Sequence, residues 1–300
     1  MKTGVIGLGA MGTPMARNLH RVGYLAGIWN RTIEKAHGLG GELGVMLAAD
    51  PADLARHCDL LILSLSADTD VLEVVGALKD GLQPGAVVVD TSTVSRETAR
   101  TAAAELESLD VAFLDAPVSG GVEGARKGTL AMMVGGDAAV LERIRPQLQA
   151  LAGRVEHMGP VGAGQATKAI NQVVAAGINQ AVSEGLAFAR ALELPLDKVI
   201  DIIGSGAAGN WFLSHRGPSM AKGAFTPGFR VALHHKDLAI CQRMAEELGV
   251  ALPLVEMTLI HYRRLMKAGF GDEDISALYR EKQGLFEKTG KTQRKPMLSP

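Results

Sequence analysis

The sequence predicts an α/β domain followed by an all-α domain, with a long helix joining the two. Three observations support this division. In the first half of the chain, short apolar runs alternate with helical patterns. A glycine-rich loop directly follows the first apolar run. Near residue 164 the strand pattern stops, and helical patterns follow. The expected boundaries are residues 1–163 for the first domain, 164–292 for the helical domain that begins with the long helix, and 293–300 for a tail.

The apolar runs of the first half have the character of strands in a parallel sheet that is covered on both faces. They are apolar throughout rather than alternating, and helical patterns separate them. We expect strands at residues 5–6, 24–29, 60–65, 86–89 and 111–114, and the runs at 130–134 and 154–157 could extend the sheet. We expect helices at residues 11–22, 54–57, 71–78 and 96–109.

The second half begins with a helical pattern from Gln165 to about Leu192 that no proline interrupts. Such a helix would span roughly 40 Å and could belong to two cores. Pro195 either ends it or starts the next helix at its first turn. Further helices are expected at residues 196–203, 233–247, 255–268 and 275–286, and the polar, basic segment 288–300 is expected to fray.

The composition narrows the class of protein. With 300 residues, of which 47% are hydrophobic, the chain is long enough for about two domains. A net charge of −1 gives no electrostatic reason to expect nucleic acid or an acidic membrane surface as a partner. Cys58 and Cys241 form no Cys-x-x-Cys pair, which indicates reduced thiols in a cytoplasmic protein. There is no signal-peptide pattern and no apolar run of about 18 residues, so we expect neither secretion nor a membrane span.

The glycine-rich loop is Gly7-Leu8-Gly9-Ala10-Met11-Gly12, a G-x-G-x-x-G between a strand and a helix. That context is the one a dinucleotide-binding Rossmann domain requires. Gly7 permits the tight turn, Gly9 lets the backbone approach a pyrophosphate, and Gly12 lets the helix pack against the strand. The helix N-terminus then presents N–H groups and a partial positive charge to the phosphates.

The residues after the second strand, Trp29-Asn30-Arg31-Thr32, indicate which dinucleotide binds. An NAD site usually has an acidic residue here, bonded to the ribose 2′-hydroxyl. Arg31 can instead pair with a 2′-phosphate through two hydrogen bonds, and Asn30 and Thr32 can add neutral ones. The alternative is that Arg31 is a solvated surface residue. We therefore expect NADP(H) to be preferred, with NAD(H) possible.

Several separated motifs extend the pattern over nearly the whole chain, from Met1 to about Phe286. With the glycine loop they comprise Asp90-Thr91-Ser92-Thr93, Asp115-Ala116-Pro117-Val118-Ser119-Gly120-Gly121, Lys168-Ala169-Ile170-Asn171-Gln172 and Lys236-Asp237-Leu238. In this order the sequence resembles the β-hydroxyacid dehydrogenase family, which includes 3-hydroxyisobutyrate dehydrogenase, tartronate semialdehyde reductase (2-hydroxy-3-oxopropionate reductase) and the glyoxylate/succinic semialdehyde reductases. The resemblance implies a Rossmann domain, a long interdomain helix and a helical domain. It also implies a homodimer or homotetramer.

Lys168, Asn171 and Gln172 share one face of the expected long helix. A lysine on an otherwise apolar helix needs an explanation, because lysines are rarely buried without a partner. By resemblance Lys168 is the catalytic acid/base, which fits carbonyl reduction because an ammonium stabilises charge on the oxygen and donates a proton. Also by resemblance, Asn171 orients Lys168 and the substrate, and Gln172 stands where relatives often have a second asparagine. The alternative is an exposed lysine at a helix start.

The segment Ser119-Gly120-Gly121 is the expected substrate site. Successive small residues let backbone N–H groups converge on an anion, and the resemblance implies that this anion is the substrate carboxylate. A simple Gly-Gly turn is the alternative. Further cofactor contacts are expected from the resemblance and from positions at the ends of strands. The expected cofactor-binding residues are Gly7, Leu8, Gly9, Ala10, Met11, Gly12, Asn30, Arg31, Thr32, Leu65, Ser66, Thr93 and Lys236.

No metal is expected. His234 and His235 are adjacent, so they do not share a helix face, and no cysteine or carboxylate completes a ligand set. Asp237 is expected to cap or pair rather than react. Trp211 and Phe212 could wall a substrate pocket or simply pack.

The substrate stays open between related small acids. Residues 227–238 look most like tartronate semialdehyde reductases, whereas residues 29–32 look more like glyoxylate/succinic semialdehyde reductases. 3-Hydroxyisobutyrate dehydrogenase is an alternative, but such relatives usually favour NAD, against which Arg31 argues. A non-catalytic dinucleotide-binding protein is an alternative of another class, and Lys168 argues against it. Lys168 also argues against imine reductases, which share the fold but typically lack the lysine.

Overall fold

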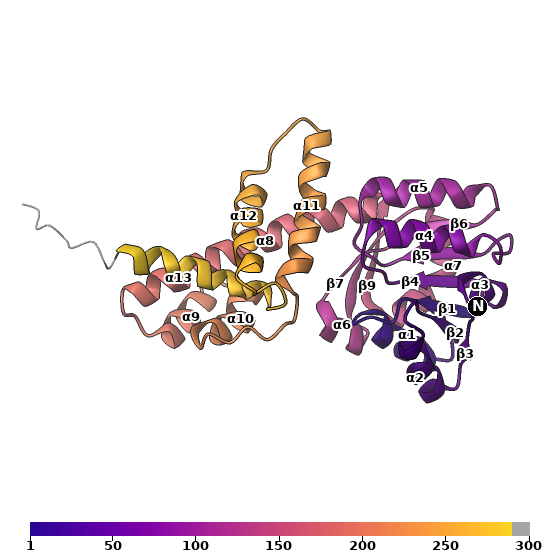
Figure 1. Ribbon diagram of the computed structural model, residues 1–300, viewed down its shortest axis with the longest axis horizontal. Coiled ribbons are helices and arrows are strands. Elements are labelled where there is room, and N and C mark those ends of the chain that lie inside the picture. Colours follow the sequence, from indigo (N-terminus) through magenta and orange to yellow (C-terminus); the bar gives the residue numbers. More distant parts are fainter. Residues whose placement is uncertain (290–300) are drawn as a thin grey trace, which may run out of the picture. The chain divides into compact units, whose positions relative to one another are not determined.

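The computed structural model describes residues 1–289, with side chains through residue 286. The tail expected at residues 293–300 therefore lies outside the described residues. In the first half, strands and helices alternate as the apolar runs predict (Figure 1). The elements are β1 (Thr3–Ile6), α1 (Gly12–Arg21), β2 (Leu25–Trp29), α2 (Ile33–Leu43), β3 (Met46–Leu47), α3 (Pro51–His57), β4 (Leu60–Leu63), α4 (Asp68–Leu78), β5 (Val87–Asp90), α5 (Arg96–Glu107), β6 (Ala112–Asp115), β7 (Val118–Ser119), α6 (Gly121–Lys127), β8 (Leu130–Gly135), α7 (Ala138–Gln149) and β9 (Ala152–Gly159).

The strands form one sheet in the order β3-β2-β1-β4-β5-β6-β8-β7, with β9 beside β8. The segment β3-β2-β1-β4-β5-β6 is parallel and has the strand order of a Rossmann fold. The order reverses between β1 and β4, where ligands bind in open sheets of this kind. The glycine loop follows β1 and so lies at this reversal.

Apolar side chains of each strand point alternately to the two faces of the sheet. Val5 belongs to a core cluster with residues of α1, α2 and α7, whereas Ile6 belongs to a cluster with residues of α3, α4 and α5. Helices therefore cover both faces (Figure 1), which explains why the strands are apolar throughout. The predicted α/β Rossmann class is confirmed.

One edge of the sheet differs from the expected parallel arrangement. Strand β8 runs antiparallel to β6 and β7. Strands β6 and β7 pair with β8 in one continuous register, with Asp115 opposite Gly135 and Val118 opposite Met132, so the chain runs in one direction through β6 and β7 and returns after α6 as β8. The sequence patterns also missed α2, β3, β7, α6 and α7. In α2 three glycines weaken the helical pattern, and in α7 Pro146 lies inside the helix.

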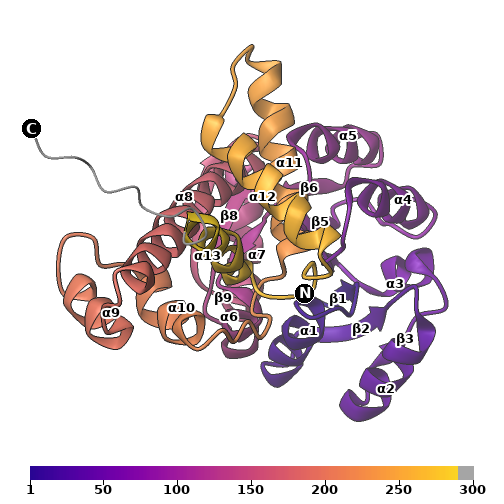
Figure 2. The same cartoon turned by 60° about the vertical axis from the view of Figure 1, so that its left-hand side comes forward.

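The second half is helical, as expected. Its elements are α8 (Ala163–Ala191), α9 (Leu196–Gly204), α10 (Trp211–Ala221), α11 (Val231–Glu247), α12 (Pro253–Lys267), the short 3₁₀ helix η1 (Ile275–Ala277) and α13 (Leu278–Thr289). Pro195 stands at the N-cap of α9 and so begins that helix rather than ending α8. Helices α11 and α12 pack against each other (Figure 2). Helix α10 was not predicted, and the segment 288–300 expected to fray is described only at residues 288 and 289, which belong to α13.

The chain divides into two compact units, residues 1–170 and the described residues from 171 onward. The division falls inside α8, which has 29 residues and is the long helix that the sequence predicts. The boundary expected at residues 163 and 164 coincides with the start of that helix. Among the described residues, no helix combines the length and the apolar character that a bilayer crossing needs.

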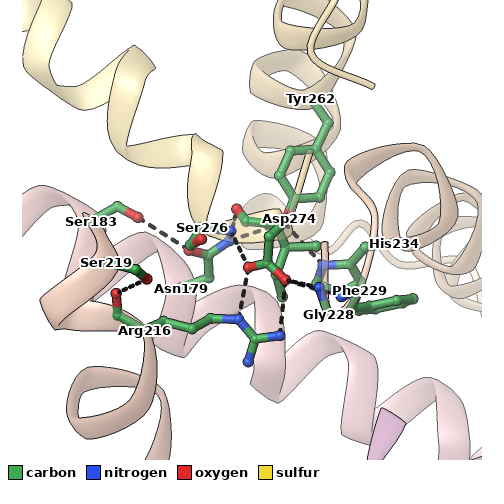
Figure 3. A network of polar contacts seen from close by, with 11 residues as sticks. Asn179, Ser183, Arg216, Ser219, Gly228, Phe229, His234, Tyr262, Asp274 and Ser276 are labelled. Carbon is green, nitrogen blue, oxygen red and sulfur yellow. Dashed lines mark hydrogen bonds and ion pairs between the residues drawn. The ribbon is translucent and has the colours of Figure 1, made fainter. Parts of the chain in front are cut away.

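A buried carboxylate organises the second unit (Figure 3). Asp274 is 3% exposed and accepts two hydrogen bonds from Arg216, at 2.7 and 3.1 Å. Backbone N–H groups of Gly228, Phe229 and Ser276 donate to the same carboxylate. Burial alone would raise the pKa of Asp274, but the Arg216 guanidinium and these N–H groups outweigh it and hold the pKa below its usual value.

Candidate active site

The three glycines of the loop after β1 have different surroundings. Gly7 has a φ of 92°, and a Cβ atom there would overlap the carbonyl oxygen of Ser64. A Cβ atom on Gly12 would overlap the carbonyl oxygen of Gly7, so only glycine lets α1 start this close to β1. A Cβ atom on Gly9 would meet no atom within 4 Å. The fold thus requires Gly7 and Gly12, whereas at Gly9 the absence of a side chain leaves open space beside the backbone.

A cavity of about 590 Å³ adjoins this loop, and its lining fits a dinucleotide phosphate. Gly9 and Ala10 line it together with three cationic residues that the sequence patterns missed, Arg17, Lys35 and Arg126. Within the described chain, the first turn of α1 contains no acidic residue and its N-cap has no side-chain hydrogen bond, so the positive end of the helix faces no protein anion of its own. Arg17 is already paired with Glu42, so the open backbone, the helix end, Lys35 and Arg126 are the groups here that suit a pyrophosphate.

The residues after β2 connect to both the glycine loop and α4. Asn30 accepts a hydrogen bond from the Leu8 N–H at 2.8 Å through Oδ1, and it donates to the Thr32 carbonyl at 2.9 Å through Nδ2. Asn30 thus holds the glycine loop, a structural role that the sequence did not reveal. Arg31 is largely exposed and donates to Asp70 at 3.0 Å.

The loops after β4 and β5 are held by side chains. The Leu65 N–H donates to Ser92 Oγ at 2.8 Å. Gln165 donates to the Ser92 carbonyl at 2.8 Å and accepts from the Val94 N–H at 3.2 Å. The Gln165 amide therefore fixes the segment that contains Thr93, an expected cofactor contact. Gln165 was missed, although its position one helical turn before Lys168 is a signal that could have found it.

Lys168 is buried, with 7% of its surface exposed, and its Nζ donates to the Val118 carbonyl at 2.8 Å. The alternative of an exposed lysine at a helix start is therefore excluded. Val118 directly precedes Ser119, Gly120 and Gly121. The structure brings the expected acid/base and the expected carboxylate site together, and both belong to the first unit.

The segment Ser119-Gly120-Gly121 joins β7 to α6 in a backbone conformation that favours glycine. Gly120 has a φ of 127° and Gly121 a φ of 61°. A Cβ atom on Gly120 would also lie 3.2 Å from Leu130 Cδ2. Both glycines are therefore required by the bend itself.

The buried side chain of Asp115 fixes where α8 begins. Its Oδ1 accepts from the Gly162 N–H at 2.7 Å, and its Oδ2 accepts from the Gln165 N–H at 2.8 Å. Burial raises the pKa of Asp115 above its ordinary value, although these N–H groups oppose the shift. The carboxyl group joins the end of β6 to the first turn of α8, one turn before Lys168.

In the second unit, three of the expected site residues are linked through a fourth. Asn171 donates to Gln172 Oε1 at 2.8 Å, and Gln172 donates to Asp237 Oδ2 at 2.6 Å. Lys236 Nζ lies 3.1 Å from Asp237 Oδ1. Asp237 is thus a pairing residue, as the sequence suggested, and it holds both Gln172 and Lys236.

Comparisons with known proteins agree with this arrangement. The family model described as the NAD binding domain of 6-phosphogluconate dehydrogenase matches residues 2–159. A second model, described as NAD-binding of NADP-dependent 3-hydroxyisobutyrate dehydrogenase, matches residues 162–281. The chain belongs to the β-hydroxyacid dehydrogenase family.

Members of the family are similar to the chain over nearly its full length. The 2-hydroxy-3-oxopropionate reductase of Escherichia coli is 37% identical over 84% of this chain and 87% of its own. The NAD-dependent L-serine dehydrogenase of Pseudomonas aeruginosa is 35% identical over 95% and 97%. The structure of Mycobacterium tuberculosis 3-hydroxyisobutyrate dehydrogenase with L-serine matches with a TM-score of 0.86, 33% identity, and coverage of 93% and 98%.

As a β-hydroxyacid dehydrogenase, the chain is an NAD(P)-dependent oxidoreductase of the 3-hydroxyisobutyrate dehydrogenase and tartronate semialdehyde reductase class. The expected nicotinamide dinucleotide cofactor is confirmed at this level. Membership of a family of enzymes sets aside the alternative of a non-catalytic dinucleotide-binding protein.

The sequence also singled out His234, Trp211 and Phe212. His234 is buried and lies 2.9 Å from the Tyr262 hydroxyl (Figure 3). Phe212 is buried, whereas Trp211 is exposed and stacks on His215. The described residues contain no group of three or more His, Cys, Asp or Glu side chains that could hold a metal ion.

Proposed function

We propose that the chain is an NADP(H)-preferring reductase of small semialdehydes or 2-oxo acids, such as tartronate semialdehyde, glyoxylate or succinic semialdehyde, which also oxidises the corresponding hydroxy acids. Lys168 is the general acid/base. The observation that carries this proposal is the hydrogen bond from Lys168 Nζ to the Val118 carbonyl, because it holds a buried ammonium beside Ser119, Gly120 and Gly121.

The bound cofactor supplies or accepts a hydride at the carbon that carries the reacting oxygen. Lys168 stabilises the negative charge that develops on that oxygen and donates the proton that completes the alcohol. In the oxidative direction the neutral amine takes the proton of the hydroxyl group. Asn171 orients Lys168 and the substrate, and Gln172 contacts the substrate.

The substrate carboxylate binds at Ser119, Gly120 and Gly121. The serine hydroxyl and the backbone N–H groups of the two glycines are the donors, and the glycine conformations support a bend that turns successive N–H groups inward. This arrangement fixes the distance between the carboxylate and the oxygen bound by Lys168. Short acids are therefore favoured.

The glycine loop, residues 7–12, holds the cofactor pyrophosphate, and Arg31, Asn30 and Thr32 favour a 2′-phosphate. Leu65, Ser66 and Thr93 border the ribose and nicotinamide. Lys236 is the member of the proposed cofactor-binding set that belongs to the second unit. Its inclusion depends on resemblance, and a Lys236→Ala variant tests it.

The named relatives support a three-carbon acid. The names of two relatives, a 2-hydroxy-3-oxopropionate reductase and an L-serine dehydrogenase, both refer to three-carbon acids. 3-Hydroxyisobutyrate is the second candidate, since the structurally similar protein from M. tuberculosis carries that activity in its name. The two buried thiols, Cys58 and Cys241, support a reducing, cytoplasmic setting.

A spectrophotometric panel tests the proposal. The purified chain is mixed with NADPH or NADH and tartronate semialdehyde, glyoxylate or succinic semialdehyde, and with NADP⁺ or NAD⁺ and L-serine or 3-hydroxyisobutyrate. We expect the highest kcat/KM for a semialdehyde or glyoxylate with NADPH. A clear preference for NADH would contradict the cofactor assignment, and turnover of 3-hydroxyisobutyrate alone would favour the second candidate.

A further inference from the structure

Arg31 is held by two acidic residues from another part of the first unit. Its Nη1 lies 3.0 Å from Asp70 Oδ1 and 3.7 Å from Glu73 Oε2. Asp70 and Glu73 stand three residues apart on α4 and therefore share a helix face. The Asp70 side chain is 19% exposed, whereas those of Arg31 and Glu73 are 70% and 69% exposed.

This arrangement places opposite charges where a cofactor is selected. In Rossmann domains the group that contacts the ribose 2′-position usually comes from the end of the second strand. Here that position provides Arg31, a partner for a 2′-phosphate. A helix 39 positions later in the sequence provides Asp70, a carboxylate of the kind that accepts a hydrogen bond from a 2′-hydroxyl.

We propose that Asp70 and Glu73 set the cofactor selectivity by competing with the 2′-phosphate for the Arg31 guanidinium. Their carboxylates neutralise Arg31 and repel a phosphate dianion, so they lower the preference for NADP(H) and let the chain use NAD(H) as well. This inference rests on the proposed role of Arg31.

The exposure of the cluster makes an exchange of partners feasible. Ion pairs between exposed side chains contribute little to the stability of a fold, so Arg31 can leave the acids without disturbing α4. A fixed negative charge within hydrogen-bonding distance of Arg31 still opposes a phosphate there, and salt screens it. Asp70 lies closer and is less exposed than Glu73, so its effect is larger.

Titration calorimetry on the full chain measures the selectivity without turnover. The probes are 2′-phospho-ADP-ribose and ADP-ribose, which differ only in the 2′-phosphate. We expect Asp70→Asn to lower the Kd for 2′-phospho-ADP-ribose about three- to tenfold relative to that for ADP-ribose, and Glu73→Gln to act in the same direction but less. Both effects shrink in high salt.

Asp80→Asn is the matched control. Asp80 is exposed and follows the end of α4, so the substitution changes the net charge equally, about 15 Å along the helix from Asp70. The proposal expects its Kd ratio to equal that of the native chain. An Asp70→Asn ratio that is unchanged, or that Asp80→Asn reproduces, overturns the competition.

Arg31→Leu separates this inference from the proposed function. If Arg31→Leu leaves the Kd ratio unchanged, the proposed NADP preference is wrong, and the competition is wrong with it. If Arg31→Leu weakens 2′-phospho-ADP-ribose but Asp70→Asn changes nothing, only the competition is wrong. In the double variant the gain from Asp70→Asn should be clearly smaller than in the native background, because only the direct repulsion of the phosphate remains when no guanidinium is left to compete for. A gain of undiminished size shows repulsion alone and overturns the competition.

Discussion

Replacing Lys168 by methionine removes the ammonium and keeps a side chain of similar length in the buried space. A positioned acid/base contributes about 10²–10⁴-fold to a rate, and one donor to a developing negative charge contributes about 10²–10³-fold. In the proposed mechanism both roles belong to one group, so the two factors do not multiply. We expect kcat to fall about 10³-fold, which corresponds to about 4 kcal/mol in the barrier.

The proposed cofactor contacts, the glycine loop and the residues after β2, do not include Lys168. The Kd for NADPH should therefore stay within about twofold of the native value, measured by calorimetry. The Val118 carbonyl loses its donor from Lys168, and an unsatisfied buried acceptor costs about 1–3 kcal/mol. The free energy of unfolding is measured alongside kcat, so that lost stability is not mistaken for lost catalysis.

Lys282 provides the control for removing a buried ammonium. It is 3% exposed, and its Nζ lies 2.7 Å from Glu184, whose side chain is 60% exposed and regains water when the lysine is lost. Lys282→Met should leave kcat unchanged. A Lys168→Met variant that keeps more than about a tenth of the native kcat, or a Lys282→Met variant that loses as much, would refute the assignment of Lys168.

Three further predictions follow from the same structure. Gly9→Val should raise the Kd for NADPH at least about tenfold without changing the melting temperature, because its Cβ meets no protein atom within 4 Å. Calorimetry measures the Kd, and thermal unfolding measures the melting temperature. Gly12→Ala should lower stability instead, because its Cβ overlaps the Gly7 carbonyl oxygen. Asp274→Asn should lower the free energy of unfolding by about 3–5 kcal/mol at pH 7, because Arg216 loses its charged partner. The folded-state pKa of Asp274 lies below the ordinary value. The stabilising contribution of Asp274 is therefore complete above about pH 4 and is lost as the pH falls through the folded-state pKa. Urea unfolding from pH 7 to pH 3 should show this loss of stability in the native chain and a smaller loss in the variant. Light scattering after size-exclusion chromatography should show a homodimer or homotetramer, and a monomer at micromolar concentration would contradict this expectation. Apolar side chains exposed on the second unit support it, among them Ile202, Leu248 and Leu285.

Local patterns in the sequence were sufficient for most of the fold. A pattern of neighbouring residues predicts each of the buried strands, the glycine loop and the uninterrupted helix α8. The antiparallel direction of β8 is not predicted in this way, because it depends on pairing with β6 and β7 across the intervening helix α6, and an apolar run does not indicate strand direction. Helix α2 was hidden because its glycines lower the local helix propensity while the sheet face holds it in place.

For the site, the sequence indicated candidate residues but did not indicate which other residues they contact through hydrogen bonds and ion pairs. Lys168 and the segment 119–121 were chosen from motifs, but their proximity depends on a hydrogen bond between residues 50 positions apart. The acids that hold Arg31 lie on a different strand–helix unit, so no local pattern around Arg31 points to them. Asn30 was interpreted as a ligand contact, and its hydrogen bond to Leu8 could not be read from the sequence because it depends on the pairing of β1 with β2.

The first turns of α8 show how one helix start can position Lys168, the proposed acid/base. The Asp115 carboxylate accepts backbone N–H groups of this turn and so joins it to the end of β6. Gln165 joins it to the loop after β5, and Lys168 joins it to β7. A group that donates a proton must be held to within about 0.5 Å of its working position. Attachment to the end of β6, the loop after β5 and the start of β7 restrains the turn in more than one direction, whereas any one of these hydrogen bonds would leave it free to pivot. The lysine is therefore positioned by residues that themselves perform no chemistry, and this is why a motif can identify Lys168 but not the side chains on which its position depends.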